Sequence, residues 1–265
     1  MSQDSAADAP APGTEREELA RLARALTHSA RRAEWRGQRR TEKPGGSPLV
    51  ARGAPSPGQT HAQTPKPPEK ASPPSSTDTL AALEKLRTTV ADCRTCHLHE
   101  TRQQTVFMDG SAQARILFIG EAPGADEDTQ GIPFVGAAGR LLTDIIEKGM
   151  GLKRSEIAIV NVLKCRPPGN RDPEPEEKAA CTPYLDQQIE LIDPEVLIPL
   201  GRHAAQHILQ SSLSISSLRG RIHDLKGRKV IPTVHPAYLL RNPEKKGECW
   251  ADIQIAMGVL GLPRT

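Results

Sequence analysis

Apolar and polar positions alternate in a regular way along the last two thirds of the chain. Four short apolar runs, bounded by glycine or polar residues, predict buried strands at residues 115–120, 156–163, 195–201 and 228–236. Each is followed by a stretch with apolar residues at three- and four-residue spacing, which predicts helices at 137–149, 174–192, 202–210 and about 244–260. Four such units in a row are typical of α/β proteins. We therefore expect a three-layer α/β/α domain with a four-stranded, mainly parallel central sheet.

The chain before these units has a different character. A narrow stripe of leucine and alanine over residues 14–36 predicts a marginal helix, within a polar segment of residues 1–40. Residues 41–77 are expected to form a disordered linker, since nine prolines lie between Pro44 and Pro74. A helix capped by Asp78 then opens the folded domain, residues 78–265. The N-terminal helix either docks weakly or binds a protein partner, and the sequence leaves both open.

The net charge is informative about partners only when it is counted separately for the two parts of the chain. Residues 1–78 carry 12 Lys and Arg against 9 Asp and Glu, whereas residues 79–265 carry 23 of each. A nucleic-acid partner would therefore need a local basic face on a neutral body. The polar N-terminus lacks the apolar region of a signal peptide, and no apolar window is long enough to span a membrane. We expect a monomeric cytoplasmic protein with no membrane partner.

Three candidate groups follow the carboxyl ends of the predicted strands, where open parallel sheets bind ligands. They are the turn from Gly120 to Gly124, Asn161 and His235. The turn is not a phosphate-binding loop, because no GK[ST] follows it, and its spacing does not match the dinucleotide fingerprint. Because the strand ends share one edge of the sheet, these groups are expected to converge on one site.

The side chains at this edge suggest recognition of a flat, polar ring. Asn161 offers one acceptor and two donors, which can match the edge of a heterocycle, although an asparagine near a strand end more often caps a turn. The Nε2–H of His235 can donate to an oxygen that gains negative charge. Phe134 either stacks on a base or anchors its loop in the core.

The cysteines suggest a metal site. Cys93 and Cys96 form a C-x-x-C pair, and Cys165 and Cys181 follow further along the chain. Four thiolates can hold zinc or a [4Fe–4S] cluster, and His97 and His99 also permit a mixed zinc site. The fifth cysteine, Cys249, is interpreted as a buried thiol.

Three motifs together carry a family resemblance. The stretches GEAPGADEDTQGIPFVGAAGRLL, NVLKCRPPGNRDP and HPAYLLRNP, in this order and with the cysteine pattern, resemble the family 4 uracil-DNA glycosylases, the iron–sulfur branch of their superfamily. The resemblance spans about Cys93 to Trp250. It implies a monofunctional DNA repair glycosylase of base excision repair that flips uracil out of single- or double-stranded DNA and hydrolyses its N-glycosidic bond. The alternative is a non-catalytic iron–sulfur module of the same fold that only binds DNA.

The resemblance also assigns roles to residues. Phe134 would stack on the flipped uracil, Asn161 would bind its polar edge, and His235 would stabilise the departing base. The backbone at Gly120, Glu121 and Ala122 would line the pocket. The resemblance implies a [4Fe–4S] cluster, rather than zinc, held by Cys93, Cys96, Cys165 and Cys181.

The first motif departs from that of the better-known family 1 enzymes. Ala122 and Gly124 stand where those enzymes carry a water-activating aspartate and a thymine-excluding tyrosine. Glu121 is therefore the candidate for both tasks. We expect the following carboxylates, Asp126, Glu127 and Asp128, to lie on a solvated face.

Basic residues after the strand ends predict the DNA-binding face, in a nucleoid-associated protein of bacterial or archaeal type. The basic candidates for DNA contact are Lys164, Arg166, Arg171, Arg219, Arg221, Arg241, Lys245 and Lys246. Leu239 and Leu240 are further candidates, because they occupy the stretch where the superfamily inserts a wedge into the base stack.

Overall fold

The structure is a computed structural model that describes residues 76–263. The predicted helix at 14–36 lies outside the described residues, as does the predicted linker up to residue 75. The first described element, helix α2 (Ser76–Ala91), confirms the helix expected there but begins two residues earlier, so Asp78 lies in its first turn and does not cap it.

The sheet has six strands in the order β1-β3-β2-β4-β6-β5. The strands are β1 (Asp109–Gly110), β2 (Ile116–Gly120), β3 (Ala158–Asn161), β4 (Val196–Pro199), β5 (His223–Leu225) and β6 (Arg228–Val230). The four central strands are parallel, and they are the four that the apolar runs predict. The prediction of four strands misses β1 and β5, which pair antiparallel at the two edges. These strands have two and three residues, too few to leave an alternating pattern.

The main helices and short helical turns follow the strands in sequence. They are η1 (His97–Glu100), α3 (Ala125–Gln130), α4 (Ala137–Asp144), η2 (Ile145–Met150), η3 (Arg154–Glu156), η4 (Pro168–Asn170), α5 (Pro175–Ile192), α6 (Gly201–Leu209), α7 (Ile215–Leu218), α8 (Pro236–Arg241), η5 (Pro243–Lys245) and α9 (Lys246–Val259). The helix predicted at 137–149 is α4 continued by the π-helical turn η2. Helix α8 is unexpected, because its proline-flanked sequence suggests a loop, but Pro236 occupies its first turn, where no N–H is needed.

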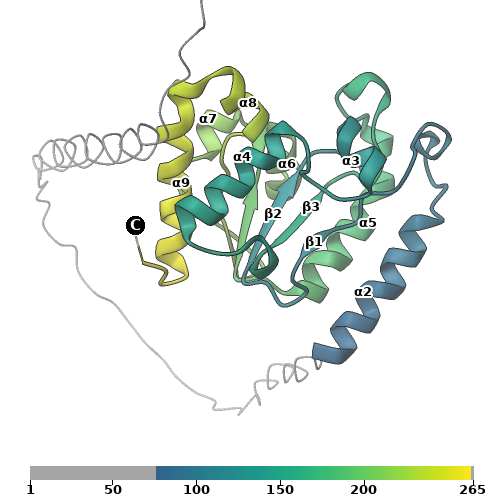
Figure 1. The fold of residues 1–265 in the computed structure, drawn as a ribbon, viewed down its shortest axis with the longest axis horizontal. Helices are drawn as coiled ribbons and strands as arrows, with labels where there is room; N and C mark the ends of the chain where they lie inside the picture. The colour runs from purple at the N-terminus through teal and green to yellow at the C-terminus, as the bar shows by residue number, and fades with distance from the viewer. Residues whose placement is uncertain (1–75, 264–265) are drawn as a thin grey trace, which may run out of the picture. The chain divides into compact units, whose positions relative to one another are not determined.

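Helices cover both faces of the sheet, which gives the three expected layers (Figure 1). Successive residues of β2 point to opposite faces. Ile116 and Phe118 pack with α4, η2 and α9, whereas Leu117 and Ile119 pack with α2, α5 and α6. Two apolar cores therefore fix the sheet from both sides, and the carboxyl ends of the strands stay available for a site.

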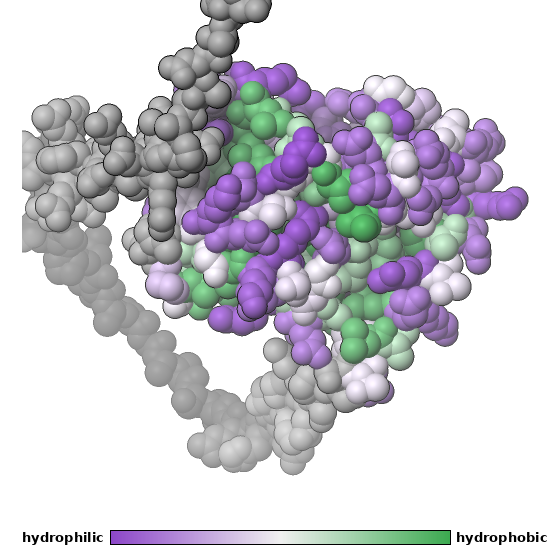
Figure 2. All heavy atoms as spheres, viewed as in Figure 1, coloured by the Kyte–Doolittle hydropathy of each residue, from purple (hydrophilic) through white to green (hydrophobic). Residues whose placement is uncertain are grey.

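The surface has a mixed character. Figure 2 shows a face on which apolar side chains are interspersed among hydrophilic ones. The exposed large apolar residues of the described part include Ile132, Leu213, Tyr238 and Leu240. Within residues 76–263, no helix has both the length and the apolar character that a membrane span requires.

Candidate active site at the carboxyl edge of the sheet

The carboxyl ends of the parallel strands carry the residues that the sequence singles out. Gly120 ends β2 and lies opposite Asn161, the last residue of β3, in the parallel register. The backbone N–H of Gly201, after β4, donates to the carbonyl of Thr233 at 2.8 Å, and His235 comes two residues later. The register of the sheet thus brings Gly120, Asn161 and His235 to one edge.

Two glycines allow the surrounding side chains to come close together. A Cβ on Gly120 would lie 2.2 Å from Oδ1 of Asn161 and 2.6 Å from Cε2 of Phe134, closer than side-chain atoms pack. Gly201 has a φ of +85°, and a Cβ there would lie 3.0 Å from the Cβ of His235. Asn161, Phe134 and His235 therefore surround the end of the sheet at the positions of these glycines.

The Phe134 ring belongs both to the core and to the site. It is 7% exposed and packs in the apolar cluster under α4 and α9. Its centroid lies 5.6 Å from that of the His235 ring, and the two planes are tilted by 31°. The ring therefore borders the same space as His235 while its buried side anchors the loop.

Asn161 carries an unused hydrogen-bonding atom. The residue is 2% exposed, and its buried oxygen Oδ1 has no hydrogen-bond partner among residues 76–263. A buried amide oxygen without a partner costs about 1–3 kcal/mol of stability. Such an atom, next to the Phe134 ring, is suited to accept a hydrogen bond from a ligand that enters the site.

The local backbone selects one tautomer of His235. This residue is the N-cap of α8, and its Nδ1 accepts the backbone N–H of Ala237 at 3.1 Å. In the neutral ring the proton therefore resides on Nε2. Burial and, to a smaller extent, the charge of Arg241 lower the pKa of His235 to about 4. His235 thus presents a neutral N–H donor at physiological pH.

Glu121 is a half-buried carboxyl group with an unusual pKa. Burial raises the pKa of Glu121 to about 7, and the nearby charge of Asp172 contributes in the same direction. Its Oε1 lies 3.8 Å from Nε2 of His203, and that nitrogen lies 3.1 Å from the Asp172 carboxylate. A carboxyl group with a pKa near 7 can take up a proton from water in the neutral range.

Sequence reasoning overlooked His203 and Asp172. His203 lies in the first turn of α6, directly after the carboxyl end of β4, so the rule that predicted the other positions also applies to it. Asp172 lies in the loop before α5 and gave no signal of its own.

The expectation that Asp126, Glu127 and Asp128 are all solvated is wrong for two of them. Asp126 is exposed, but Asp128 is 2% exposed and accepts the backbone N–H of Gln103 at 3.0 Å. Glu127 accepts three backbone N–H groups, from Gly124, Val135 and Gly136, at 2.9–3.0 Å. These carboxylates fold the loop that carries Phe134, and a count of charges along the sequence cannot show that.

The cysteines of the predicted metal site lie beside this edge of the sheet. Cys165 and Cys181 are buried and pack with Cys96 around Leu98 and Leu163. Ala122, assigned to the pocket wall by resemblance, packs against the same cluster. Several donors point at the sulfurs, since Arg102 donates to Sγ of Cys165 at 3.1 Å and the Tyr184 hydroxyl donates to Sγ of Cys93 at 3.3 Å.

The four thiols suit both candidate groups. Tetrahedral zinc would hold its sulfurs about 3.8 Å apart, from a Zn–S bond of about 2.3 Å. Among the described residues, which include all five cysteines, no three sulfurs lie within 4.8 Å of one another. Four cysteines on neighbouring segments can hold either zinc or a [4Fe–4S] cluster. Burial raises the pKa of Cys181 to about 11, and coordination to a metal would deprotonate such a thiol.

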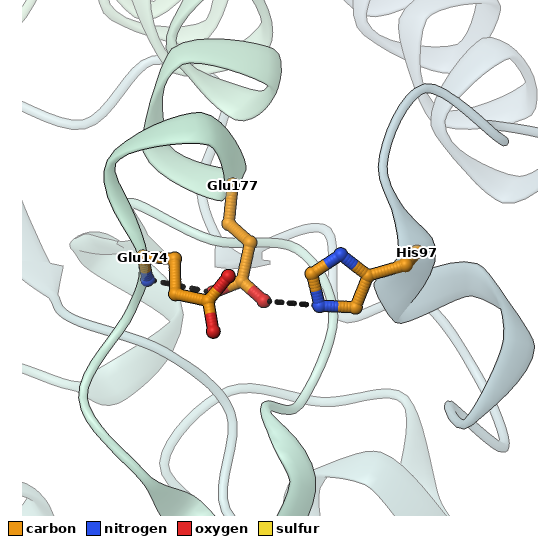
Figure 3. A group of neighbouring side chains, drawn as sticks. All are labelled: His97, Glu174 and Glu177. Carbon is orange, nitrogen blue, oxygen red and sulfur yellow. Dashed lines mark hydrogen bonds and ion pairs between the residues drawn. The ribbon is translucent and has the colours of Figure 1, made fainter.

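A mixed zinc site with His97 and His99 is not favoured by their contacts. Figure 3 shows the His97 ring facing the Glu177 carboxylate, with Nε2 and Oε1 2.9 Å apart. Arg171 already binds Glu177 through both terminal nitrogens, at 2.9 and 2.5 Å. Nδ1 of His99 lies 2.8 Å from the carbonyl of Cys96. These contacts connect the Cys93–Cys96 segment to α5, the helix that carries Cys181.

The arginines predicted to contact DNA differ in exposure and in whether they already form ion pairs within the protein. Arg171 is bound to Glu177, and Arg219 is bound to Asp252 at 2.9 Å and to Glu248 at 3.1 Å. Within the described residues, Arg221 and Arg241 are exposed, whereas the half-buried Arg166 donates to Asn170 at 2.8 Å.

The two leucines of the predicted wedge face in opposite directions. Leu239 is 1% exposed and belongs to the core, whereas Leu240 is 47% exposed. Leu240 is therefore the leucine of helix α8 that faces solvent.

Comparisons with known proteins place the chain in a family. The family model for the uracil DNA glycosylase superfamily matches residues 107–254. The type-4 uracil-DNA glycosylase of Sulfurisphaera tokodaii is 46% identical in an alignment of 172 positions that covers 62% of this chain and 78% of that protein. The type-4 enzyme of Archaeoglobus fulgidus is 43% identical, over 66% of this chain and 92% of that protein. The type-4 enzyme of Thermotoga maritima is 47% identical, over 60% of this chain and 84% of that protein.

Proposed function

This chain belongs to the uracil DNA glycosylase superfamily, and from that premise we propose that it removes uracil from DNA in repair. It hydrolyses the N-glycosidic bond of uracil and leaves an abasic site. One observation carries the proposal. The buried, unpartnered Oδ1 of Asn161 lies beside the Phe134 ring, at an edge where His235 supplies a neutral N–H donor.

Recognition of the base follows from the chemistry of Asn161. Uracil presents an N3–H donor between two carbonyl oxygens, and Oδ1 of Asn161 accepts that N–H. Cytosine has a lone pair at N3 in place of the N–H. Its N3 would therefore face Oδ1 of Asn161 as a second acceptor, and Oδ1 would stay without a hydrogen bond. The penalty for such a buried polar atom is about 1–3 kcal/mol, which discriminates between the two bases. Phe134 stacks on the flipped ring, as aromatic side chains do at other base-flipping sites.

His235 stabilises the leaving group. As the glycosidic bond breaks, negative charge develops on uracil O2, and Nε2–H of His235 donates to it. A positioned donor of this kind contributes about 3–4 kcal/mol to the stability of a transition state. Because the proton sits on Nε2 in the neutral ring, the donor requires no protonation step.

Glu121 activates the water molecule that attacks the sugar when the base departs. Its raised pKa makes it a base of suitable strength near neutral pH. The water attacks C1′ of the oxocarbenium-like sugar and transfers a proton to the Glu121 carboxylate. His203 and Asp172 surround this carboxyl group.

A [4Fe–4S] cluster held by Cys93, Cys96, Cys165 and Cys181 completes the proposed site. The clustering of Cys165 and Cys181 with Cys96 and the donors from Arg102 and Tyr184 support it. The excision requires no electron transfer, so the cluster would serve to hold α2 and α5 together beside the pocket.

The face that carries the pocket binds uracil-containing DNA, single- or double-stranded. Arg166, Arg221 and Arg241 contact phosphates, and Leu240 enters the base stack. We propose that residues 78–265 act as a monomeric glycosylase domain on nucleoid DNA in the cytoplasm, and that residues 1–40, beyond a linker of residues 41–77, provide a contact for a protein partner.

The test is excision from a labelled oligonucleotide with one U·G pair, followed by alkaline cleavage of the abasic site, beside a uracil-free duplex. We expect a single break at uracil, and a loss of about 10²–10³-fold in the variants Asn161→Ala and His235→Ala with DNA affinity nearly unchanged. Protein that carries its cluster and binds DNA without cutting at uracil would contradict catalysis and favour a DNA-binding module.

A further inference from the structure

The stacking ring is attached to an unusual stretch of backbone. Phe134 has a φ of +55°, in the left-handed region that residues other than glycine seldom adopt. If Phe134 had the negative φ that is usual for residues other than glycine, its ring would point in a different direction. Contacts around the loop must therefore hold Phe134 in this conformation.

The peptide on the C-terminal side of Phe134 has support from two elements. The N–H of Val135 donates to Glu127 at 2.9 Å. Gly139 of α4 lies so close that a Cβ there would stand 1.9 Å from the carbonyl oxygen of Phe134. This side of the ring is held by a carboxylate and by direct backbone packing.

The peptide on the N-terminal side depends on one guanidinium group. Arg154 donates to the carbonyl of Pro133 at 2.7 Å through Nη2. Its Nη1 donates to Oγ1 of Thr143 at 2.8 Å, and its Nε donates to Oδ2 of Asp109 at 2.7 Å. One side chain thereby connects the edge strand β1, helix α4 and the loop of Phe134.

The surroundings of Arg154 show why the loop depends on it. A hollow of about 430 Å³ borders both Phe134 and Arg154, and Arg140, Thr143 and Asp144 also line it. On that side the loop therefore lacks close packing. The guanidinium, whose side chain is 20% exposed, bridges the gap with directional hydrogen bonds.

We propose that Arg154 is a positioning residue for base capture: it fixes the backbone of Phe134 so that the ring stacks on the flipped uracil. This inference rests on the proposed function, because it concerns the same pocket. Arg154 acts through Phe134 and does not touch the base. The guanidinium fork matters more than its charge, since three acceptors in different directions must be reached at once.

The experiment compares full-length wild type with Arg154→Met and Arg154→Lys. We measure excision of uracil from a U·G duplex and inhibition by free uracil. In Arg154→Met we expect kcat/KM to fall about tenfold to a hundredfold, as a misplaced contact group does, and inhibition by uracil to weaken by a similar factor. Arg154→Lys should recover little of the loss, because an ammonium group cannot span the three acceptors.

A double-mutant cycle separates positioning from general stability. In a Phe134→Ala background, Arg154→Met should lower kcat/KM no further, because the ring through which Arg154 acts is gone. The matched control is Arg115→Met. That arginine likewise binds one carboxylate, on Glu195, and one backbone carbonyl, on Leu260, but it lies near the amino end of β2.

Two outcomes would overturn the inference. One is a kcat/KM for Arg154→Met that equals that of Arg115→Met. The other is that Arg154→Met lowers kcat/KM by the same factor in the Phe134→Ala background as in wild type. Failure of the proposed function would look different, because wild type itself would then leave the U·G duplex intact. If Arg154→Met does not fold, the same two comparisons are made with Arg154→Lys.

Discussion

The ammonium group of Lys164 donates a hydrogen bond of 2.5 Å to the backbone carbonyl of Asn161. Lys164 is 1% exposed, so it is not the solvated phosphate contact that the sequence predicts. Burial lowers the pKa of its amine to about 7, and thiolates at Cys181 and Cys165 would raise it. One buried amine therefore binds the residue proposed to bind the base and lies close enough to two predicted cysteine ligands to respond to their charge.

Replacement of Lys164 by Met should weaken both sites. The Asn161 carbonyl would lose its buried donor, at a cost of about 1–3 kcal/mol, and metal-bound thiolates would lose a neighbouring amine that can carry a positive charge. We expect less iron and sulfide bound per chain, a lower Tm, and slower excision in the fraction that is fully loaded. Cys249→Ala is the control, since this thiol packs in the other core, and it should keep its full iron content. Normal iron content together with normal excision in Lys164→Met would disprove the connection.

A single methyl group at Gly120 should close the pocket. The added Cβ would collide with Oδ1 of Asn161 and with the Phe134 ring, both of which are fixed by packing. We expect Gly120→Ala to lose at least about a hundredfold in excision, since the base could no longer reach its contacts. Gly227→Ala is a suitable comparison: its φ is +87°, but a Cβ there meets no atom within 4 Å, so the variant should lose some stability and little activity. Fluorescence anisotropy with labelled DNA should show near-normal binding in both.

Excision should depend on pH through Glu121. The carboxylate is the active form of the proposed base, so kcat should rise with pH through an apparent pKa near 7. Glu121→Gln should lower kcat and abolish this inflection. The pKa of His235, about 4, lies outside the measured range, so no step near 6.5 is expected. If kcat of Glu121→Gln shows the same inflection with pH as wild type, the titrating group is not Glu121.

The same carboxyl group has a predictable effect on folding. Folding raises the pKa of Glu121 from its ordinary 4.5 to about 7, so the folded state holds the proton more tightly. The resulting penalty is absent below 4.5 and complete above 7. Thermal unfolding should therefore find Glu121→Gln more stable than wild type at pH 8 and equal to it at pH 4.5.

Leu240 should matter for paired uracil and less for unpaired uracil. A wedge fills the space that the flipped nucleotide leaves in a duplex, whereas a single strand has no stack to hold open. We expect Leu240→Ala to slow excision from a U·A duplex about tenfold and to change the single-stranded rate by less than about twofold. Leu213→Ala, at an equally exposed leucine outside α8, should leave both rates unchanged. Equal losses on both substrates would contradict a wedge.

Much of the fold follows from local sequence because four strands and their helices each leave a long periodic signal. β2, β3 and β4 are short apolar runs whose side chains alternate between the two cores, so the central sheet is predictable. β1 and β5 escape prediction because two- and three-residue edge strands owe their pairing to neighbours distant in sequence.

The candidate site likewise contains residues that the sequence predicts and residues that it does not. Gly120, Asn161 and His235 are predictable because each follows a strand end. The supporting residues are not, since Glu127, Arg154 and Lys164 act through backbone groups of other segments. A charged residue bonded to a distant peptide looks in the sequence like any solvated charge.

The left-handed backbone of Phe134 sets a limit on the stability of this protein. Conformational energy of about 1–3 kcal/mol is stored in such a residue whether or not DNA is present. The ring is therefore pre-organised, and capture of a base needs little further ordering of the loop. A glycine at this position would relieve the strain and remove the ring with it. Selection for thermal stability alone would therefore favour chains that melt later and capture the base poorly.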